Sequence, residues 1–155
     1  MELFHTSPNK IEKITMSGRY GQFLCFSANI YEMSACATVA YKIDIEDEKV
    51  IAASELFYIE NSAEILKIQI NEVCKIAHVD FDTAMELIDG SESIWNLDSD
   101  IANEDKAEID WDIQHISAKA AKMMGYRGVS VRDEQGTCYM IDMLGFENEL
   151  QEVAE

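Results

Sequence analysis

Apolar and polar residues alternate along several stretches of the chain, and this period of two is typical of half-buried β-strands. The clearest case is 39–45, where Val39, Tyr41, Ile43 and Ile45 share one face. Shorter apolar runs predict further strands at residues 2–6, 23–28, 50–53, 128–131 and 137–144, with a turn at Glu134-Gln135-Gly136 between the last two. The pattern therefore places strands at both ends of the chain.

Helical periodicity dominates the middle of the chain instead. From Ser62 onward, apolar residues recur about one turn apart, at Ile65, Leu66, Ile70, Val73 and Ala77. A second helix is predicted over 80–89, with Gly90 as its end. A third runs from a cap at Asn103 to about Met124, with the apolar stripe Ile109, Ile113, Ile116, Ala120 and Met123. Weaker patterns predict a helical turn at 10–14, a short helix at 31–37, and helical or frayed structure over 146–155.

Strands at both ends with helices between them indicate an α+β fold rather than alternating βαβ units. A length of 155 residues, of which 48% are apolar, suits one domain with its own core, and we expect a single domain over 1–155. Apolar runs fall well short of a membrane span, and the start lacks a basic region followed by an apolar stretch. We therefore expect neither a membrane segment nor a signal peptide.

The net charge of −18 narrows the choice of partners, because such a surface repels nucleic acid and favours basic molecules. The acidic run over 98–110 is expected to form a solvated helix face, and it could also steer the protein toward a basic partner. Four scattered cysteines without a C-x-x-C pair predict reduced thiols. The histidines are not spaced as a zinc set, so we expect no metal site.

Candidate chemistry starts with the run Phe4-His5-Thr6-Ser7-Pro8, followed by Gly18-Arg19-Tyr20-Gly21 and the strand-like run Phe23-Leu24-Cys25-Phe26-Ser27. This order resembles the NAD-binding half of the ADP-ribosyltransferase fold. Together with the late run from Asp133 to Gly145, it resembles the anti-CRISPR ADP-ribosyltransferases that disable type I-F surveillance complexes. The resemblance implies a split antiparallel sheet with an NAD cleft, and a helical insertion at about 59–110.

That resemblance also implies roles for residues of the first strand and the loop after it. His5 would bond the ribose of NAD, backbone groups of Thr6 would bind the nicotinamide amide, and Ser7 would assist near the phosphates. A dianionic pyrophosphate in so acidic a chain needs a local cation, and Arg19 is one of three arginines. Arg19 is therefore the first choice for that contact, while a surface salt bridge is its alternative role.

Phe26 and Ser27 resemble the family's second strand, in which a hydroxyl supports the first-strand histidine. Ser27 takes that supporting role by resemblance. An aromatic ring after this strand stacks on nicotinamide in the family, and Tyr31 is the candidate here, with Tyr20 as a competitor. Packing in the core is the alternative for each ring.

The catalytic acid is the least direct assignment, because Cys138 stands where many members of the superfamily have a Glu. Asp133, in the preceding turn, is the first choice to bind the ribose hydroxyl and polarise the acceptor. Glu134 and Gln135 are second choices, and Asp112 on the third predicted helix is a further candidate. Ordinary solvation of a hairpin turn is the alternative for the acidic turn, and Cys138 lacks the local signature of a cysteine hydrolase.

Taken together, the resemblance implies a mono-ADP-ribosyltransferase that uses NAD as co-substrate and modifies a protein, on an asparagine in this family. The implied target is the PAM-recognising subunit of the type I-F surveillance complex, in the cytoplasm of the bacterial host. We expect no metal, no direct contact with nucleic acid and no membrane. Two alternatives stay open: a non-catalytic acidic mimic of DNA that inhibits the same complex, and a toxin-type transferase with another target.

Overall fold

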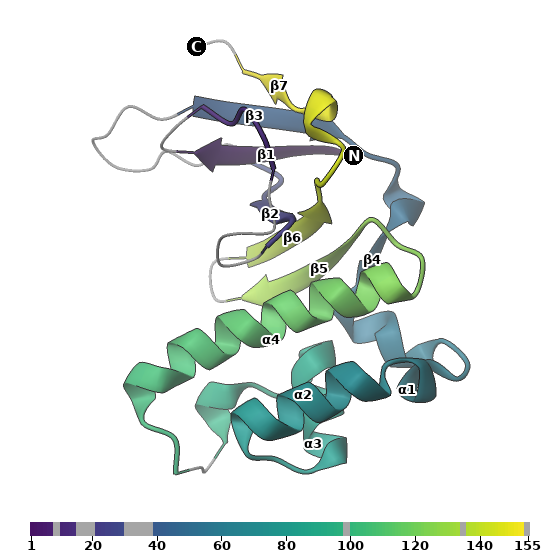
Figure 1. The fold of residues 1–155 in the computed structure, drawn as a ribbon, viewed down its shortest axis with the longest axis vertical. Helices are drawn as coiled ribbons and strands as arrows, with labels where there is room; N and C mark the ends of the chain where they lie inside the picture. Colours follow the sequence, from purple (N-terminus) through teal and green to yellow (C-terminus); the bar gives the residue numbers. More distant parts are fainter. Residues whose placement is uncertain (8–9, 15–20, 30–38, 98–99, 134–135, 154–155) are drawn as a thin grey trace.

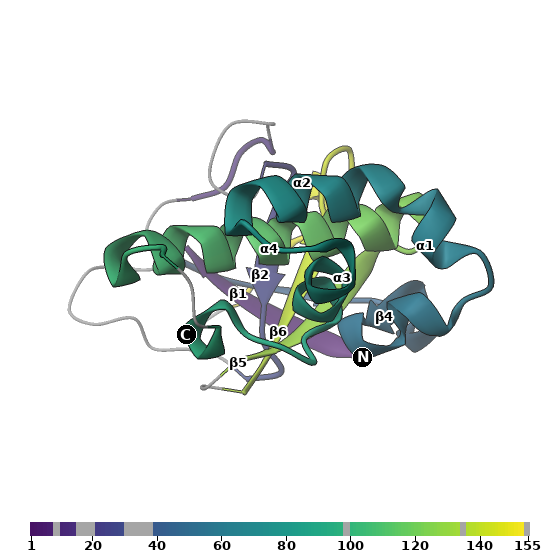
Figure 2. The ribbon, with the colours of Figure 1, turned by 90° about the horizontal axis from the view of Figure 1, so that it is seen from below.

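Two β-sheets are stacked above a layer of helices in the computed structural model, which describes residues 1–7, 10–14, 21–29, 39–97, 100–133 and 136–153. Figure 1 shows the sheet that carries the N-terminal strand at the top, the second sheet in the middle and the helices below. Figure 2 looks from the helices toward the strands, and α4 and α2 lie across the sheet in this view. The mixture of strands and helices confirms the broad fold class, while the antiparallel arrangement holds only in part.

The first sheet is antiparallel, with the order β1 (Glu2–Ser7), β3 (Val39–Asp44) and β7 (Gln151–Glu152). Tyr41 and Ile43 are buried on one face of β3, so the alternation of apolar residues predicts its buried face. The prediction of a helical or frayed C-terminus is wrong for β7, because Glu152 pairs with Tyr41 and the Val153 amide bonds the Ala40 carbonyl at 2.8 Å.

The second sheet has the order β2 (Phe23–Phe26), β6 (Gly136–Asp142), β5 (Gly128–Asp133) and β4 (Val50–Ala52). β5 and β6 form the predicted hairpin, and β2 adds to β6 as an antiparallel edge strand. β4 runs parallel to β5, which corrects the expectation of an entirely antiparallel sheet. The parallel pairing is possible because most of the helical layer separates β4 from β5 in the sequence.

The helices are α1 (Ser62–Ile65), α2 (Lys67–Ala77), α3 (Phe81–Asp89) and α4 (Asn103–Met123). Asp80 caps α3 by accepting a 2.8 Å hydrogen bond from the Thr83 amide, and Gly90 ends it with φ +83°. The predicted helix from Ser62 is broken at Leu66, where φ −96° and ψ 16° depart from helical values. No helix in the described part of the chain is long and apolar enough to cross a membrane.

Two smaller expectations are corrected, and a third is not tested. Residues 10–14 carry no helical turn. Two members of the predicted apolar stripes, Ile65 and Met123, are 45% and 54% exposed, and each is the last residue of its helix. The short helix predicted at 31–37 lies outside the described residues.

Each face of the second sheet contacts its own hydrophobic core. Phe23, Cys138 and Met140 point toward the helices and pack with side chains such as Ile70. Phe26 and Ile141 occupy alternate strand positions, so they point the other way and pack with residues of the first sheet. The second sheet is therefore the central layer, between the helices and the first sheet.

Truncating a buried residue of α2 should reveal how strongly the helical layer supports this arrangement. Ile70 is fully buried and Ile68, two residues away on the same helix, is 74% exposed. Ile70→Ala should lower the free energy of unfolding by about 2–5 kcal/mol, because it removes apolar contacts and leaves a cavity. The matched change Ile68→Ala should stay within about 0.5 kcal/mol. Urea unfolding measures both, and equal losses would contradict the layer assignment.

Candidate active site

The two sheets meet through a pair of backbone hydrogen bonds between their edge strands. The Phe4 amide donates to the Ser27 carbonyl, and the Ser27 amide donates to the Phe4 carbonyl, both at 2.8 Å. Phe4 lies in β1 at one edge of the first sheet, and Ser27 directly follows β2 at one edge of the second. Apart from this bridge, β1 pairs with β3 and β2 pairs with β6, so the two sheets separate here. The residues next to the bridge therefore lie where the sheets separate.

His5 lies at this point, directly after the bridging residue Phe4. Its Nδ1 lies 2.7 Å from the carbonyl oxygen of Cys25, and its ring centroid lies 5.6 Å from that of Phe26 at an interplanar angle of 55°. A carbonyl has no proton to donate, so Nδ1 must carry the hydrogen. The other ring nitrogen, Nε2, then keeps its lone pair in the neutral imidazole and can accept a hydrogen bond.

The surroundings of His5 favour this neutral form. Burial lowers the pKa of the imidazole below its ordinary value of 6.5, because removing water disfavours the charged ring, and the hydrogen bond to Cys25 opposes this shift only in part. At neutral pH the side chain is therefore an oriented, uncharged hydrogen-bond acceptor rather than a cation.

The other residues assigned to the first two strands lie around the bridge. Thr6 and Ser7 continue β1 and are half-buried, and Phe26 is buried beside His5. Ser27 is buried, and its hydroxyl donates a hydrogen bond to the Asn29 carbonyl. The orientation of His5 thus comes from the Cys25 carbonyl, a backbone group that side-chain patterns do not reveal.

The remaining assigned residues belong to two other segments. Asp133 is the last residue of β5 and pairs with Gly136 of β6, so its backbone position is fixed while its side chain is outside the description. Arg19, Tyr20, Tyr31, Glu134 and Gln135 also lie outside the described residues.

A disulfide joins Cys25 to Cys138, which corrects the prediction of reduced thiols for these two residues. The cysteines are 113 residues apart in the sequence, and the pairing of β2 with β6 brings them together. Cys138 is buried and its sulfur is bonded, so it is not a free nucleophile in this structure. Cys74 is a free thiol, as predicted.

Helix α4 brings a second group of ionisable residues to the same strand. The His115 ring lies 5.8 Å from the Phe23 ring in an edge-on arrangement, and Phe23 precedes Cys25 by two positions on β2. Burial is the largest cause of the lowered pKa of His115, Lys119 lowers it further, and Glu72 and Asp112 oppose the shift. Asp112 is therefore close enough to interact with a ring that packs on β2.

Sequence patterns alone did not indicate His115, because it lies beside the apolar stripe of α4 and belongs to no motif. Its spacing of three residues from Asp112 is the one sequence feature that points to His115, because residues three apart share a helix face. Within the described residues, no group of three or more His, Cys, Asp or Glu side chains could hold a metal ion.

The arrangement of two sheets over a helical layer is also found in a solved structure described as a crystal structure of an anti-CRISPR protein. The two chains are 20% identical, the match covers 91% of this chain and 88% of that one, and the TM-score is 0.53. At this level of identity the comparison supports the fold alone.

The family follows from the sequence match. A model of the family described as "Anti-CRISPR Type I-F ADP-ribosyltransferase AcrIF11" matches residues 1–147, and the chain belongs to this family. Membership confirms the resemblance drawn from the short runs around His5 and after Asp133. It also implies anti-CRISPR ADP-ribosylation and, in general, NAD as co-substrate. A search of curated proteins found no match.

The tautomer and pKa of His5 can be tested directly. Nitrogen-detected NMR of the imidazole should show the neutral ring protonated on Nδ1, with a titration midpoint below 6.5, because Cys25 accepts from Nδ1 and burial disfavours the charged ring. His5→Gln identifies the signal by its loss. A ring protonated on Nε2, or a midpoint at or above 6.5, would contradict the geometry.

The same shift makes the stability of the fold depend on pH. Between the folded and unfolded pKa values of His5, the unfolded chain binds more protons, so stability rises with pH in this window. The contribution of His5 is fully present above pH 6.5 and is lost as the pH falls below that value. Comparing wild type with His5→Gln by urea unfolding across this range should show a smaller acid loss in the variant. If the wild type and His5→Gln lose the same amount of stability as the pH falls, His5 does not contribute to the pH dependence.

Proposed function

We propose that this protein is an NAD-dependent mono-ADP-ribosyltransferase that modifies the PAM-recognising subunit of the type I-F CRISPR surveillance complex. The observation that carries the proposal is the oriented, neutral His5 at the junction of the two sheets, in a chain of this family. Thr6 and Ser7 extend the same strand on one side of the junction. A co-substrate bound there would contact the strand that the motif predicts.

The reaction breaks the bond between ribose C1′ and the nicotinamide nitrogen, and the electron pair leaves with nicotinamide. The ribose passes through a cationic, oxocarbenium-like state, as in glycoside hydrolysis. His5 Nε2 is the proposed acceptor for a ribose hydroxyl. Its lowered pKa is useful for this role, because a protonated ring beside the cationic ribose would raise the barrier. Backbone groups of Thr6 are proposed to hold the nicotinamide amide.

The acceptor nitrogen then forms a new bond to C1′ and loses a proton to a carboxylate. An asparagine amide is a poor nucleophile, so the site must align it closely with the ribose. We propose Asp133 for this step, because it is the last residue of β5 and directly precedes the acidic turn. Glu134 and Gln135 are the proposed residues for positioning the target, and Arg19 with Ser7 for the pyrophosphate.

The product explains why the modification would inhibit the complex. An ADP-ribose adduct is bulky and carries two negative phosphates. At a position that reads DNA, it would block binding by steric exclusion and by repulsion from the phosphate backbone. One enzyme could inactivate many complexes in the host cytoplasm, so few copies of the inhibitor would suffice.

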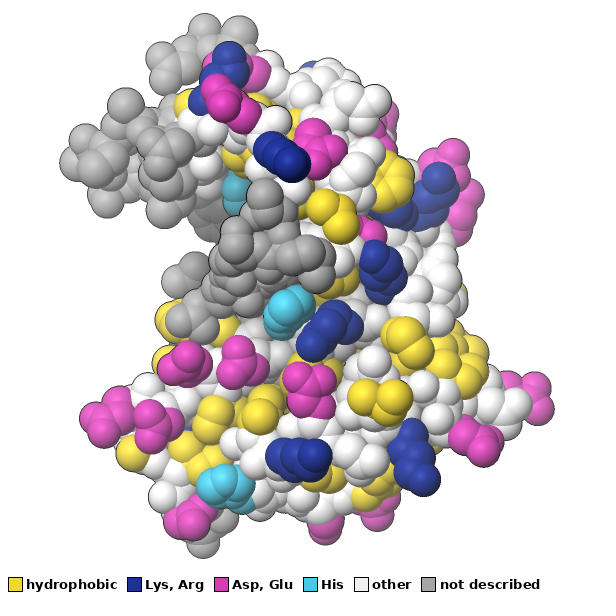
Figure 3. All heavy atoms as spheres, viewed as in Figure 1, with side chains coloured by type: hydrophobic (Ala, Val, Ile, Leu, Met, Phe, Trp, Pro, Cys, Tyr) yellow, Lys and Arg dark blue, Asp and Glu magenta, His cyan; other side chains and the backbone are white. Residues whose placement is uncertain are grey.

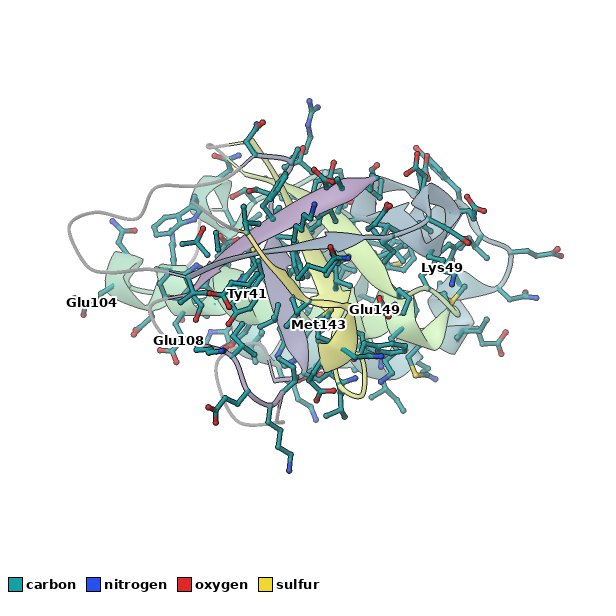
Figure 4. All side chains as sticks on the ribbon, turned by 90° about the horizontal axis from the view of Figure 1, so that it is seen from above. Tyr41, Lys49, Glu104, Glu108, Met143 and Glu149 are labelled. Atoms are coloured by element: carbon teal, nitrogen blue, oxygen red, sulfur yellow. A yellow bond between two sulfur atoms is a disulfide. The ribbon has the colours of Figure 1, made fainter. Side chains whose placement is uncertain are left out.

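A second function has its own supporting observation in the charge of the molecule. The net charge is −18, and acidic side chains gather at the end of the helical layer in Figure 3. Glu104 and Glu108 project from the start of α4 in Figure 4 and are exposed. Such a surface could imitate nucleic acid without catalysis. As part of the enzyme, the same surface would steer it toward a basic target.

Intact-mass measurement of each subunit, after a purified type I-F surveillance complex is incubated with the protein and NAD, tests the enzyme. One subunit should gain a single ADP-ribose at inhibitor amounts well below one per complex. His5→Ala should lower the rate by about 10²-fold or more, because the ribose loses its acceptor. His78→Asn changes an exposed histidine at the end of α2 and should leave the rate unchanged. Inhibition at one per complex without NAD and without a mass gain would support the acidic mimic instead.

Paired substitutions can decide which carboxylate acts on the acceptor. Asp133→Asn keeps the shape of the side chain and removes its charge, so turnover should fall by about 10²- to 10⁴-fold. Asp112→Asn is the matched change on α4 and should stay within about threefold of wild type. Single-turnover transfer rates measure both. A larger loss of turnover in Asp112→Asn than in Asp133→Asn would assign the catalytic role to Asp112, beside His115.

A further inference from the structure

Charges of opposite sign are segregated along one face of α4. Residues three or four apart share a helix face, and one such stripe consists of Glu108, Asp112, His115, Lys119 and Lys122. Glu108 and Lys122 are exposed, while the three residues between them are half-buried. Figure 3 shows acidic side chains together at one end of the helical layer and lysines farther along the same face. The stripe therefore starts acidic, passes a histidine and ends basic.

This segregation is unfavourable for an isolated helix. Glu108 and Asp112 are four residues apart, and Lys119 and Lys122 are three apart, so like charges are neighbours in each half of the stripe. The helix dipole favours acids in the first turn and bases in the last, but Glu108 and Lys119 lie farther inside α4. Opposite charges from outside the helix would relieve the repulsion in both halves.

The chain itself supplies only part of these opposite charges. Lys119 Nζ lies 3.6 Å from Glu72 Oε1, and Lys122 Nζ lies 3.1 Å from Asp142 Oδ2. The two lysine side chains are still 40% and 49% exposed, and each ammonium group has three N–H donors, so each can bind a further carboxylate. Glu108 has no ion-pair partner in the part of the chain that the structure describes.

We propose that this face of α4 binds a second copy of the chain, with the two α4 helices antiparallel about a two-fold axis at His115. Glu108 and Lys122 each lie seven residues from His115, about 10.5 Å along a helix that rises 1.5 Å per residue. The two-fold rotation therefore places Glu108 of one copy opposite Lys122 of the other. Asp112 and Lys119, three and four residues from His115, also come opposite each other. The stripe is self-complementary, as a symmetric dimer contact requires.

Exposed apolar side chains border the stripe and extend the contact. Trp111 and Met123 of α4 are 41% and 54% exposed, and Ile68 of α2 is 74% exposed. Figures 1 and 2 show α2 beside α4 and antiparallel to it, and the Lys119–Glu72 ion pair gives their alignment. One turn along from this pair, Met123 and Ile68 lie at the same end of the face. Burying these side chains against a second copy would stabilise the dimer, and Trp and Met are enriched at protein interfaces.

Repulsion between the two copies is limited at this face. Burial is the largest cause of the lowered pKa of His115, so two neutral rings meet at the axis. Each copy carries a net charge of −18, but at physiological salt the Debye length is about 8 Å. Distant charges are therefore screened, and the charges in direct contact decide the interaction.

Sedimentation equilibrium over a range of protein concentrations tests the dimer. The wild-type mass should rise from the 17.6 kDa of one chain toward twice that value. Glu108→Lys turns two attractive pairs into two repulsive ones, so the dissociation constant should rise about tenfold or more. Glu104→Lys makes the same change of charge one turn earlier, where it would face a point beyond the end of the second α4. It should leave the dissociation constant within about threefold of wild type.

A wild type that stays monomeric at every concentration would overturn the proposal. Equal effects of Glu108→Lys and Glu104→Lys would also overturn it, because they would assign the change to net charge rather than to the stripe.

Mixing two variants tests the antiparallel arrangement itself. Lys122→Glu alone should weaken the dimer as Glu108→Lys does. In an equimolar mixture of the two, the new lysine faces the new glutamate and the unchanged Lys122 faces the unchanged Glu108, so a dimer of near wild-type affinity should form. Variants that fail to combine would overturn the arrangement. If Lys122→Glu folds poorly because it places an acid beside Asp142, Asp112→Lys mixed with Lys119→Glu gives the same test.

Discussion

Two hydrogen bonds between Phe4 and Ser27 decide where the functional residues of this protein meet. They join the edge strands of two sheets that otherwise share no regular pairing in the described residues. Backbone groups at a sheet edge need partners when they are buried, so the bridge satisfies both edges at one point. The position directly after Phe4 is His5, and the carbonyl it contacts belongs to Cys25, two positions before Ser27. The bridge therefore fixes the imidazole and its acceptor in relation to each other.

The chemistry of His5 follows from this backbone arrangement rather than from a charged neighbour. A carboxylate in place of the Cys25 carbonyl would favour the imidazolium, and the ring would be a cation near neutral pH. A carbonyl orients the ring equally well while burial keeps it neutral. The disulfide from Cys25 to Cys138 links the same strand to β6, so the position of the acceptor carbonyl depends on the central sheet.

The sequence predicted those elements whose signals lie within a few residues of one another along the chain. The alternation in β3, the end of α3 at Gly90 and the hairpin of β5 and β6 are short-range signals, and each has its counterpart in the structure. The parallel pairing of β4, the strand β7 and the disulfide depend on contacts between distant residues, for which periodicity carries no signal. The same holds for the candidate site: a motif identified His5, whereas the Cys25 carbonyl that orients it is a backbone group common to every residue.

The region after β6 is held by the same kind of contact between distant residues. Gln22 and Asp142 are 120 residues apart, and Ile14 and Glu147 are 133 residues apart. Arg127 then connects this region to Glu149, just before β7, which pairs with β3, the neighbour of the strand that carries His5. β7 itself lies after residue 147, where the family match ends. The first sheet is thus held from both sides, by the Phe4–Ser27 bridge at one edge and by the C-terminal segment at the other. A change in the C-terminal segment can therefore alter the site without touching any residue in it.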